Sequence, residues 1–499
     1  MPKRTPLIHV GIIIDGSSPV PFHRQLYDHL RASILSGQLQ AGTRLPSTRA
    51  LAQDLGISRN TVTTAYDQLL AEGYIESRVG HGTTVVPLLP EHLINVAPTH
   101  AAPLSATPAH PQLSQRGQLI ASASFMPASR SLLTTTPPFR SGVPALDAFP
   151  FALWSQLIQR HARNSFSAWG HYQQSYGYQP LREAIAAHIG VTRGVRCIAA
   201  QVLIVSGSQQ AIDLAARMLL DPGDQAWIED PGYPGTRNAL LAAGATLIPV
   251  PIDTEGISVS QGRVLAPQAR LVATTPSHQF PLGVTMSLPR RLELLEWARQ
   301  ANAWILEDDY DSEYRFTGRP LSTLQGLDGA QRVLYIGTFS KVLFPSLRLG
   351  FLVVPSDLVD AFANMLHTTT YHHSVLEQMA LADFISEGHF ARHLRTMRTL
   401  YAARASSFVR IAHEEVASLM EISMPHTGLH IVGWLPPGVD DQLVVREVFA
   451  KGVEVTPLST LAQTPLPQGG LLFGYATFEE ATMRSGLRRL ASVLKEYNL

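Results

Sequence analysis

Apolar residues near the start of the chain recur every four positions, which matches the turn of an α-helix. Leu26, Leu30 and Ile34 predict an amphipathic helix over about residues 21–36. A second helix is expected to begin after Ser47, whose hydroxyl is suited to cap its first turn. A third helix follows within a few residues. Two packed helices joined by so short a turn predict a helix-turn-helix domain.

The third predicted helix, which begins near Ile57, carries its polar residues in the first turns. These side chains can donate hydrogen bonds to phosphates and bases, and they are Arg59, Asn60, Thr61 and Thr63. In a helix-turn-helix, this part of the second of the two packed helices meets the DNA. Alternating residues then predict short strands at 74–78 and 83–86. The glycine-containing segment Val79–Gly82 between them predicts a tight wing whose backbone can approach a phosphate.

Residues 20–87 resemble the GntR-type winged-helix family in strings that are more specific than helix-turn-helix spacing alone. The strings are Gly42–Arg49, Ser58–Val62, Glu72–Ile75 and Gly80–Thr83. The resemblance implies contact with double-stranded DNA. The implied DNA-binding residues are Arg49, Arg59, Asn60, Thr61, Thr63 and Gly82, with Arg44 and Ser47 as supporting candidates. The alternative is a small helical packing domain whose polar residues merely face solvent.

The stretch from Pro87 to about Pro138 shows no sustained period and is rich in Pro, Ala, Ser, Thr and His. Such a composition predicts a long tether without elements of its own. We therefore expect a DNA-binding domain at residues 1–87, a linker at 88–138 and a larger domain at 139–499.

Short β-branched runs alternate with amphipathic helices from about residue 140. The predicted strands are 201–205, 226–228, 246–250, 271–274, 304–306, 333–336 and 349–354, and the predicted helices include 211–220 and 288–300. This alternation predicts an α/β domain with a mostly parallel sheet. Ligands of such a sheet bind at the carboxyl ends of its strands.

Chemically suited side chains follow several of these strands. Ser206–Gln209 falls between a strand and a helix, where backbone N–H groups and hydroxyls can hold a phosphate. Asp308 and Tyr310 are two residues apart and so lie on one side of an extended chain. A carboxylate such as Asp308 can keep a pyridine nitrogen protonated, and a phenol such as Tyr310 can donate a hydrogen bond to an oxygen on the same ring. Lys341 follows the next strand, where a pocket lowers the pKa of an amine and favours a Schiff base. Ser340 and Arg348 would add phosphate donors, and the Tyr233 ring could stack on a cofactor ring.

The order of these groups resembles the fold type I, aminotransferase class I and II family of pyridoxal-phosphate proteins over residues 140–499. The matching strings are Thr275–Pro281, Glu307–Glu313 and Gly337–Lys341. The resemblance implies a large α/β domain, a smaller C-terminal α+β domain, and pyridoxal 5'-phosphate held as an internal aldimine on Lys341, the catalytic residue. The implied cofactor-binding residues are Ser206, Gly207, Ser208, Gln209, Tyr233, His278, Asp308, Tyr310, Ser340, Lys341 and Arg348. Whether His278 or Gln279 partners the ring oxygen stays open.

Taken as a whole, the chain resembles a MocR-type regulator of the GntR superfamily. The resemblance implies a transcription regulator that senses an amine, an amino acid or pyridoxal phosphate itself. It further implies a head-to-tail, domain-swapped homodimer in which each DNA-binding domain crosses to its partner's cofactor domain. The alternative is an active aminotransferase that carries an accessory DNA-binding module.

One position departs from the family pattern. Members that bind amino acids often carry an arginine in the C-terminal strand, two residues before a Gly-aromatic pair, where it grips the substrate carboxylate. This chain has Leu472 at that place. Arg237 or Arg319 could substitute, and an effector without a carboxylate is equally consistent with leucine.

Composition narrows the classes of protein to which the chain can belong. The length of 499 residues and the hydrophobic content of 45% predict a globular chain with two or more domains. The net charge is zero, so the chain as a whole shows no excess of basic residues that would indicate a nucleic-acid partner. The apolar run at the N-terminus is short and is broken by His9, which is not typical of a signal peptide. A single cysteine, Cys197, cannot form an internal disulfide, as is usual in a reducing compartment. We therefore expect a cytoplasmic protein without a membrane partner. His389 and His393 have helical spacing but no further ligand nearby, so we assign no metal.

Overall fold

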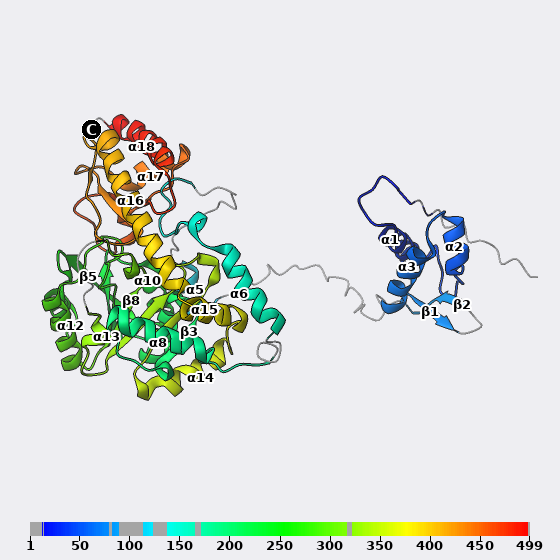
Figure 1. Cartoon of the computed structure of the whole chain (residues 1–499), viewed down its shortest axis with the longest axis horizontal. Helices are drawn as coiled ribbons and strands as arrows, with labels where there is room; N and C mark the ends of the chain where they lie inside the picture. The colour runs from blue at the N-terminus through cyan, green and yellow to red at the C-terminus, as the bar shows by residue number, and fades with distance from the viewer. Residues whose placement is uncertain are drawn as a thin grey trace, which may run out of the picture. The chain divides into compact units, whose positions relative to one another are not determined.

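The computed structural model describes residue 12 and the ranges 14–78, 82–88, 113–122, 137–164, 171–316 and 322–497. The chain divides into two compact units, Met1–Gln112 and Leu113–Leu499, and each is described by itself. Figure 1 labels their helices and strands. Within the described ranges, no helix has both the length and the apolar character that crossing a membrane would require.

The described part of the N-terminal unit contains three helices and a two-stranded sheet. Its elements are α1 (Phe22–Leu35), α2 (Thr48–Asp54), α3 (Arg59–Ala71), β1 (Ile75–Arg78) and β2 (Gly82–Val85). The two strands pair antiparallel, and Leu26, Val62 and Leu69 are completely buried between the helices. The predicted winged helix-turn-helix is therefore confirmed. Residues 79–81 of the predicted wing lie outside the described residues.

Two serines begin the helices of the helix-turn-helix. The Ser47 hydroxyl accepts a hydrogen bond from the Ala50 N–H at 3.2 Å, which confirms its predicted capping role. The Ser58 hydroxyl accepts one from the Thr61 N–H at 3.1 Å. Because Ser58 has the extended backbone of a cap, α3 begins at Arg59, two residues later than the sequence pattern indicates.

Among its described residues, the predicted tether contains one helix that the pattern does not predict. Helix α5 (Gln115–Ser122) lies beside α10 (Pro234–Ala243) of the larger unit. None of its described side chains is buried, and Leu119 and Ile120 are both exposed. The helix therefore has no apolar stripe from which a period could be recognised. Residues 89–112 and 123–136 of the predicted linker lie outside the described residues.

An eight-stranded sheet forms the centre of the larger unit, in the order β3-β10-β9-β8-β7-β4-β5-β6. The strands are β3 (Val202–Val205), β4 (Gln225–Asp230), β5 (Thr246–Asp253), β6 (Gly256–Ile257), β7 (Leu271–Thr274), β8 (Trp304–Asp309), β9 (Val333–Thr338) and β10 (Gly350–Val353). The five strands from β9 to β5 run parallel, as predicted. Strand β10 was predicted as a strand, but it pairs antiparallel with both β3 and β9, so the sheet is mixed.

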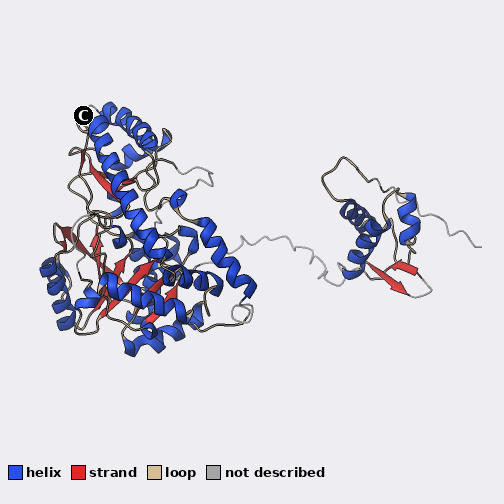
Figure 2. Cartoon of the chain, viewed as in Figure 1, coloured by secondary structure: helices blue, strands red, loops and turns tan. Residues whose placement is uncertain are grey.

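Helices cover both faces of this sheet (Figure 2). Those that pack on its strands are α8 (Gln179–Arg193), α9 (Ser208–Leu219), α10, α11 (Val259–Leu265), α12 (Leu288–Ala301) and α13 (Leu324–Leu327). Outside them, α14 (Val359–Thr369) packs on α9, α15 (Val375–Ser386) packs on α8, and α6 (Phe151–Asn164) packs on α15. Strand β4 illustrates the two layers, because Ala226 and Ile228 join the core beneath α9 and α10. Trp227 between them points the other way and stacks on Trp297 at 3.7 Å. Strands buried on both faces explain the near-continuous apolar runs in the sequence.

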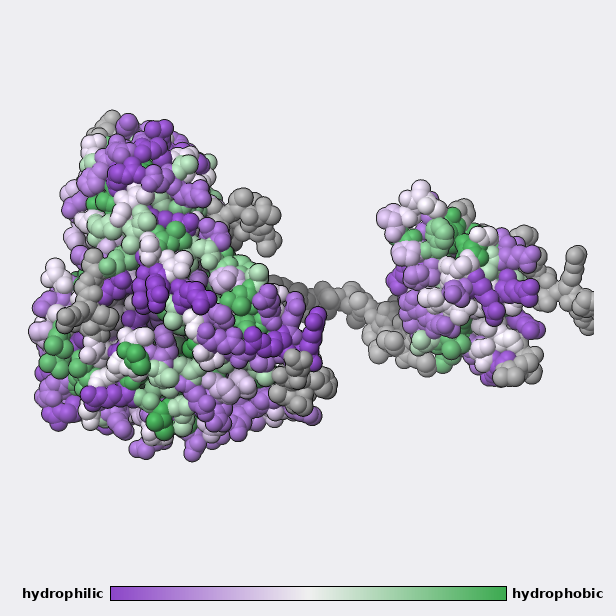
Figure 3. Space-filling model, in the orientation of Figure 1, coloured by the Kyte–Doolittle hydropathy of each residue, from purple (hydrophilic) through white to green (hydrophobic). Residues whose placement is uncertain are grey.

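A smaller C-terminal α+β subdomain completes this unit, as the family resemblance implies. It contains α16 (His389–Val416), β11 (Glu421–Ile422), β12 (His430–Trp434), α17 (Asp441–Ala450), β13 (Thr456–Pro457), β14 (Gly470–Gly474) and α18 (Glu480–Leu494). Its antiparallel sheet has the order β11-β12-β14-β13. The surface over α18 is largely hydrophilic (Figure 3). Strand β12 begins beside the cavity described next.

Candidate cofactor and DNA-binding sites

A cavity of about 240 Å³ lies at the carboxyl ends of the central strands of the larger unit. Nine of the eleven residues that sequence reasoning proposed for the cofactor line this cavity, and they are Gly207, Ser208, Gln209, Tyr233, Asp308, Tyr310, Ser340, Lys341 and Arg348. They come from segments up to about 140 residues apart along the chain. The parallel strands bring them together because their carboxyl ends share one edge of the sheet.

Lys341 follows β9 and directs its amine into the cavity. Its Nζ donates a hydrogen bond to the Gly142 carbonyl oxygen at 2.9 Å. Burial lowers the pKa of the Lys341 amine, while the Asp311 and Asp308 carboxylates act in the opposite direction. A lowered pKa increases the fraction of neutral, nucleophilic amine near pH 7. Gly142 itself was not anticipated, because it lies about 200 residues away and the sequence carries no local sign of the contact.

Asp308 is the last residue but one of β8 and lines the same cavity. It accepts a hydrogen bond from the Ser208 hydroxyl at 3.2 Å. Burial raises the pKa of Asp308 to about 7, although the bond from Ser208 acts to lower it. A cationic group bound beside Asp308 would restore its ionised form. A protonated pyridine nitrogen is such a group.

The beginning of α9 and the segment after β9 form the part of the cavity suited to an anion. Gly207 precedes α9 with φ +89°, and the free N–H groups of the first helical turn follow it. A Cβ at Gly207 would lie 3.9 Å from both Ser340 Oγ and Arg348 Nη1. Ser340 Oγ is buried and has no hydrogen-bond partner among the residues that the structure describes. These donors fit a phosphate group.

Two of the eleven proposed residues do not line the cavity. The Ser206 hydroxyl lies 3.1 Å from His373 Nδ1 instead. His278 is buried behind Tyr310, with its Nδ1 3.1 Å from the Tyr310 hydroxyl. Gln279, the alternative partner for the ring oxygen, donates to the Pro231 carbonyl at 2.9 Å and does not line the cavity either.

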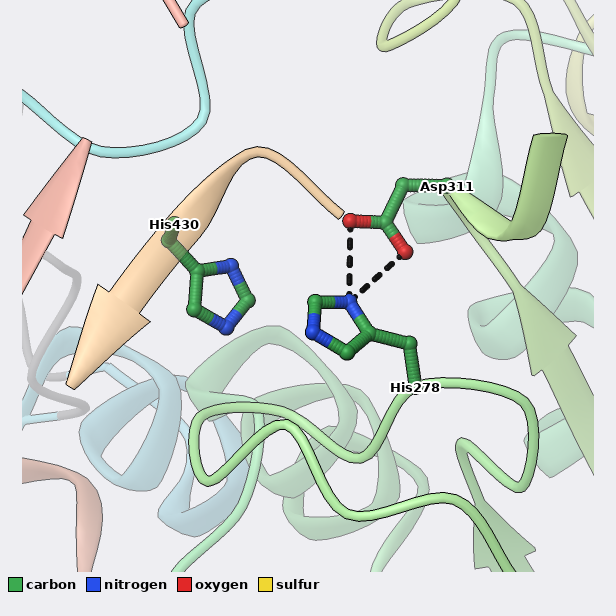
Figure 4. A group of neighbouring side chains, drawn as sticks. All are labelled: His278, Asp311 and His430. Atoms are coloured by element: carbon green, nitrogen blue, oxygen red, sulfur yellow. Dashed lines mark hydrogen bonds and ion pairs between the residues drawn. The ribbon is translucent and has the colours of Figure 1, made fainter. Parts of the chain in front are cut away.

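Asp311 and His430 also line the cavity, and neither was proposed from the sequence. His430 belongs to β12 and reaches the site only through the packing of the smaller subdomain. Figure 4 shows it beside the pair formed by His278 and Asp311. The three side chains are close enough to share a cation. However, His278 Nδ1 is hydrogen-bonded to Asp311, and His430 Nε2 lies 3.1 Å from the Pro281 carbonyl oxygen, so we assign no metal.

Leu472 occupies the middle of β14 and does not line the cavity. It is completely buried and packs with Leu458 and Leu461. Arg237, one alternative for a carboxylate partner, lines an adjoining cavity of about 20 Å³ that shares Tyr233 and Asp308 with the first. Arg319, the other alternative, lies outside the described residues.

Replacing Leu472 tests whether this position tolerates the family's arginine. Leu472→Arg should lower the free energy of unfolding by at least about 3 kcal/mol, because it buries a guanidinium among apolar side chains. Leu472→Met is the matched control and should cost less than about 1.5 kcal/mol. Urea denaturation followed by circular dichroism measures both, and wild-type stability of Leu472→Arg would contradict the packing described here.

The first turns of α3 present the proposed DNA-contacting residues of the N-terminal unit. Arg59 and Asn60 are exposed, and Arg59 Nε lies 3.4 Å from the Thr48 hydroxyl, next to the start of α2. The hydroxyls of Thr61 and Thr63 already make local hydrogen bonds, the first with Ser58 and the second to the Arg59 carbonyl. Arg59 and Asn60 are therefore the exposed members of this group at the start of α3.

The remaining proposed residues surround this helix. Arg49 is exposed on α2, while Ser47 acts as the helix cap described above. Arg44 pairs with Thr84 of β2. A Cβ on Gly82, which has φ +82°, would lie 2.8 Å from Arg44 Nε, so glycine lets this arginine cross the base of the wing. The arrangement offers cationic side chains on α2, α3 and the edge of the sheet.

Comparison with known proteins assigns both units. Residues 139–489 match the family described as aminotransferase class I and II, and residues 22–85 match the bacterial regulatory proteins of the gntR family. The fold and its cavity thus define an aminotransferase-like protein with a winged-helix DNA-binding domain. The chain belongs to the GntR-type transcription regulators that carry an aminotransferase class I and II domain.

Relatives along nearly the full length support this assignment. The chain is 46% identical over 481 residues to the probable rhizopine catabolism regulatory protein MocR of Rhizobium meliloti, covering 96% of this chain and 95% of that protein. It is 29% identical to the HTH-type pyridoxine biosynthesis transcriptional regulator PdxR of Corynebacterium glutamicum, covering 98% and 99%. The crystal structure of LysN, an α-aminoadipate aminotransferase from Thermus thermophilus complexed with N-(5'-phosphopyridoxyl)-L-leucine, matches with TM-score 0.70 and 28% identity, covering 77% and 97%.

Proposed function

We propose that this regulator binds pyridoxal 5'-phosphate in the cavity and controls transcription according to an amine, an amino acid or the cofactor itself. The observation that carries the proposal is the buried Lys341 amine, whose pKa is lowered, in a cavity that also holds Asp308 and an anion-binding end. The complex of LysN with a phosphopyridoxyl compound supports the same cofactor. A metabolite sensor joined to a DNA-binding domain is a regulator.

Each part of the cofactor has residues suited to it. Lys341 would bind its aldehyde, Asp308 would pair with the ring nitrogen, and Tyr310 would face the ring hydroxyl. The phosphate would lie at the start of α9, near Ser208, Ser340 and Arg348. When bound, the cofactor supplies an electrophilic aldehyde that condenses with primary amines, so an effector amine competes directly with Lys341.

The N-terminal unit would position its basic residues on DNA. Arg49, Arg59 and Asn60 would reach bases or phosphates, and Thr61, Thr63, Arg44, Ser47 and Gly82 would support the contact. We further propose a head-to-tail homodimer, with the segment at 88–138 allowing each DNA-binding unit to cross to its partner's cofactor domain. A protein with these tasks works in the cytoplasm.

The proposal is tested by DNA footprinting on fragments next to the protein's own gene. Pyridoxal phosphate alone, and then a series of amines with and without a carboxylate, should change the footprint. The absence of any specific footprint on these fragments would contradict the proposal. Steady amino transfer from a donor to a 2-oxo acid, at about 1–10³ per second, would instead favour an enzyme that carries an accessory DNA module.

A further inference from the structure

His278 lies at the centre of a buried group that joins the cavity to the smaller subdomain. Its Nδ1 is 2.9 Å from Asp311 Oδ1, 3.0 Å from Asp311 Oδ2 and 3.1 Å from the Tyr310 hydroxyl. Its ring stacks on that of His430 at 4.7 Å. Figure 4 shows the Nδ1 edge of His278 turned toward Asp311, with His430 on the other side.

The geometry indicates where the hydrogen of this group resides. A protonated carboxyl group would donate through one oxygen alone, whereas the two Asp311 oxygens lie at nearly equal distances from Nδ1. An N–H that donates between two acceptor oxygens fits this arrangement, which favours a hydrogen on His278 Nδ1 over one on Asp311. That nitrogen then has no lone pair to accept the phenol hydrogen of Tyr310. The Tyr310 hydroxyl keeps its hydrogen for another acceptor, and Tyr310 lines the cavity.

The smaller subdomain holds His278 in this orientation. Gly428 has φ +87°, and a Cβ there would overlap His278 Cε1 and lie 2.8 Å from Asp311 Oδ2. The Tyr475 hydroxyl donates to the Gly428 carbonyl at 2.6 Å and keeps this backbone in place. Burial lowers the pKa of His430 well below its usual value, so a neutral ring packs against His278.

We propose that Asp311 is a positioning residue that fixes His278 as an Nδ1–H donor, so that the Tyr310 phenol directs its hydrogen into the cavity, with Gly428 and His430 as the supports. This inference rests on the proposed function, because the acceptor of that hydrogen would be the ring oxygen of the bound cofactor. Without the Asp311 carboxylate, Nδ1 becomes free to accept the Tyr310 hydrogen. Among the described residues, the other titratable groups that act on Tyr310 and His430 are Asp308, Asp309, Glu229 and Lys341.

The location of the hydrogen is tested first on the cofactor-free protein. Long-range ¹H–¹⁵N spectra of the histidine rings, with His278 assigned by its loss in His278→Asn, should show Nδ1 protonated in the wild type. In Asp311→Leu the hydrogen should move to Nε2. A wild-type His278 protonated only at Nε2, or no change in Asp311→Leu, would overturn the inference.

The consequence for the cavity is tested on the cofactor-loaded protein by titrating its visible band with pH. A hydrogen bond to the negatively charged ring oxygen keeps the midpoint low, so Tyr310→Phe should raise the midpoint by about one pH unit. Asp311→Leu removes the same hydrogen bond, but it also removes a carboxylate that raises the pKa of Lys341. In the Tyr310→Phe background only this charge effect remains, so the shift caused by Asp311→Leu should be about one pH unit lower there than in the protein that keeps Tyr310. Equal shifts of Asp311→Leu in the two backgrounds would overturn the inference.

A matched pair of glycine variants separates this contact from backbone strain. Gly428→Ala should reproduce the shift of the midpoint, because its Cβ displaces His278. Gly438 has φ +85°, and no described atom lies within 4 Å of the place where its Cβ would stand, so Gly438→Ala should leave the midpoint unchanged. Equal shifts in both variants would contradict the role of Gly428. If the wild type gains no visible band at all, the proposed function fails, while the histidine spectra still decide where the hydrogen resides.

Discussion

Lys341→Ala is expected to abolish the visible band that the protein acquires with pyridoxal phosphate. Lys341 is the only lysine among the described residues that line the cavity. The whole chain contains just four lysines, at positions 3, 341, 451 and 495. Borohydride reduction followed by peptide mass spectrometry should therefore find the cofactor on position 341 in the wild type, and on none of the four in the variant.

Loss of the band should not reflect loss of the fold. Replacing Lys341 removes an amine whose burial is unfavourable, so the free energy of unfolding should stay within about 1 kcal/mol of the wild type or increase. Lys451→Ala is the matched control, since Lys451 is exposed and bonded to Ser492 and Glu496 in the smaller subdomain. It should keep the band. A full band in Lys341→Ala would exclude the proposed site.

Arg59→Ala is expected to weaken operator binding by about 5- to 150-fold, which corresponds to about 1–3 kcal/mol for a base-contacting side chain. The residue is exposed in the first turn of α3, and its removal leaves the N-terminal core intact. If Arg59 contacts a phosphate instead, affinity should fall equally for all DNA sequences. The slope of log affinity against log salt concentration should then become less steep by about one unit. Fluorescence anisotropy at several salt concentrations distinguishes the two results.

Arg24→Ala provides the control for this measurement. Arg24 is an exposed arginine on α1 that lies 3.4 Å from Asp28, so its removal changes the charge of the same unit away from α3. Its effect on operator binding should be small, and the visible band should remain in both variants. Equal losses in Arg24→Ala and Arg59→Ala would mean that only the total charge matters. Loss of the band in Arg59→Ala would show that the two units are not independent.

Local patterns were sufficient for most of the secondary structure. The apolar period of α1 and the polar start of α3 predicted the helix-turn-helix, since each helix buries one stripe against its neighbours. The β-branched runs of β3 to β9 predicted a parallel sheet, and the order of the motifs along the chain predicted which segments meet at its edge. Helix α5 was not predicted because none of its described side chains is buried, so the sequence shows no apolar period there.

Contacts between distant segments were beyond such patterns. Gly142, Asp311 and His430 were not proposed from the sequence, although all three line the cavity. His430 is about 90 residues from Lys341 and belongs to a different sheet, so no spacing rule relates them. Ser206 was proposed because it lies between a strand and a helix, and His278 because it belongs to a matching string, but their side chains turn toward His373 and Asp311. A local motif does not determine which distant residue each of its side chains contacts.

The sequence by itself determined that this protein joins a winged helix to an aminotransferase-like domain, and it determined which lysine faces the cavity. These properties depend on periodicity and on short motifs, which are encoded within a few turns or strands. Only the tertiary structure decided how β10 runs, that Leu472 fills a core, and that Gly428 and His430 from the smaller subdomain support His278. Those features arise where separate segments pack together, because burial and hydrogen bonding there depend on groups that the local sequence does not contain.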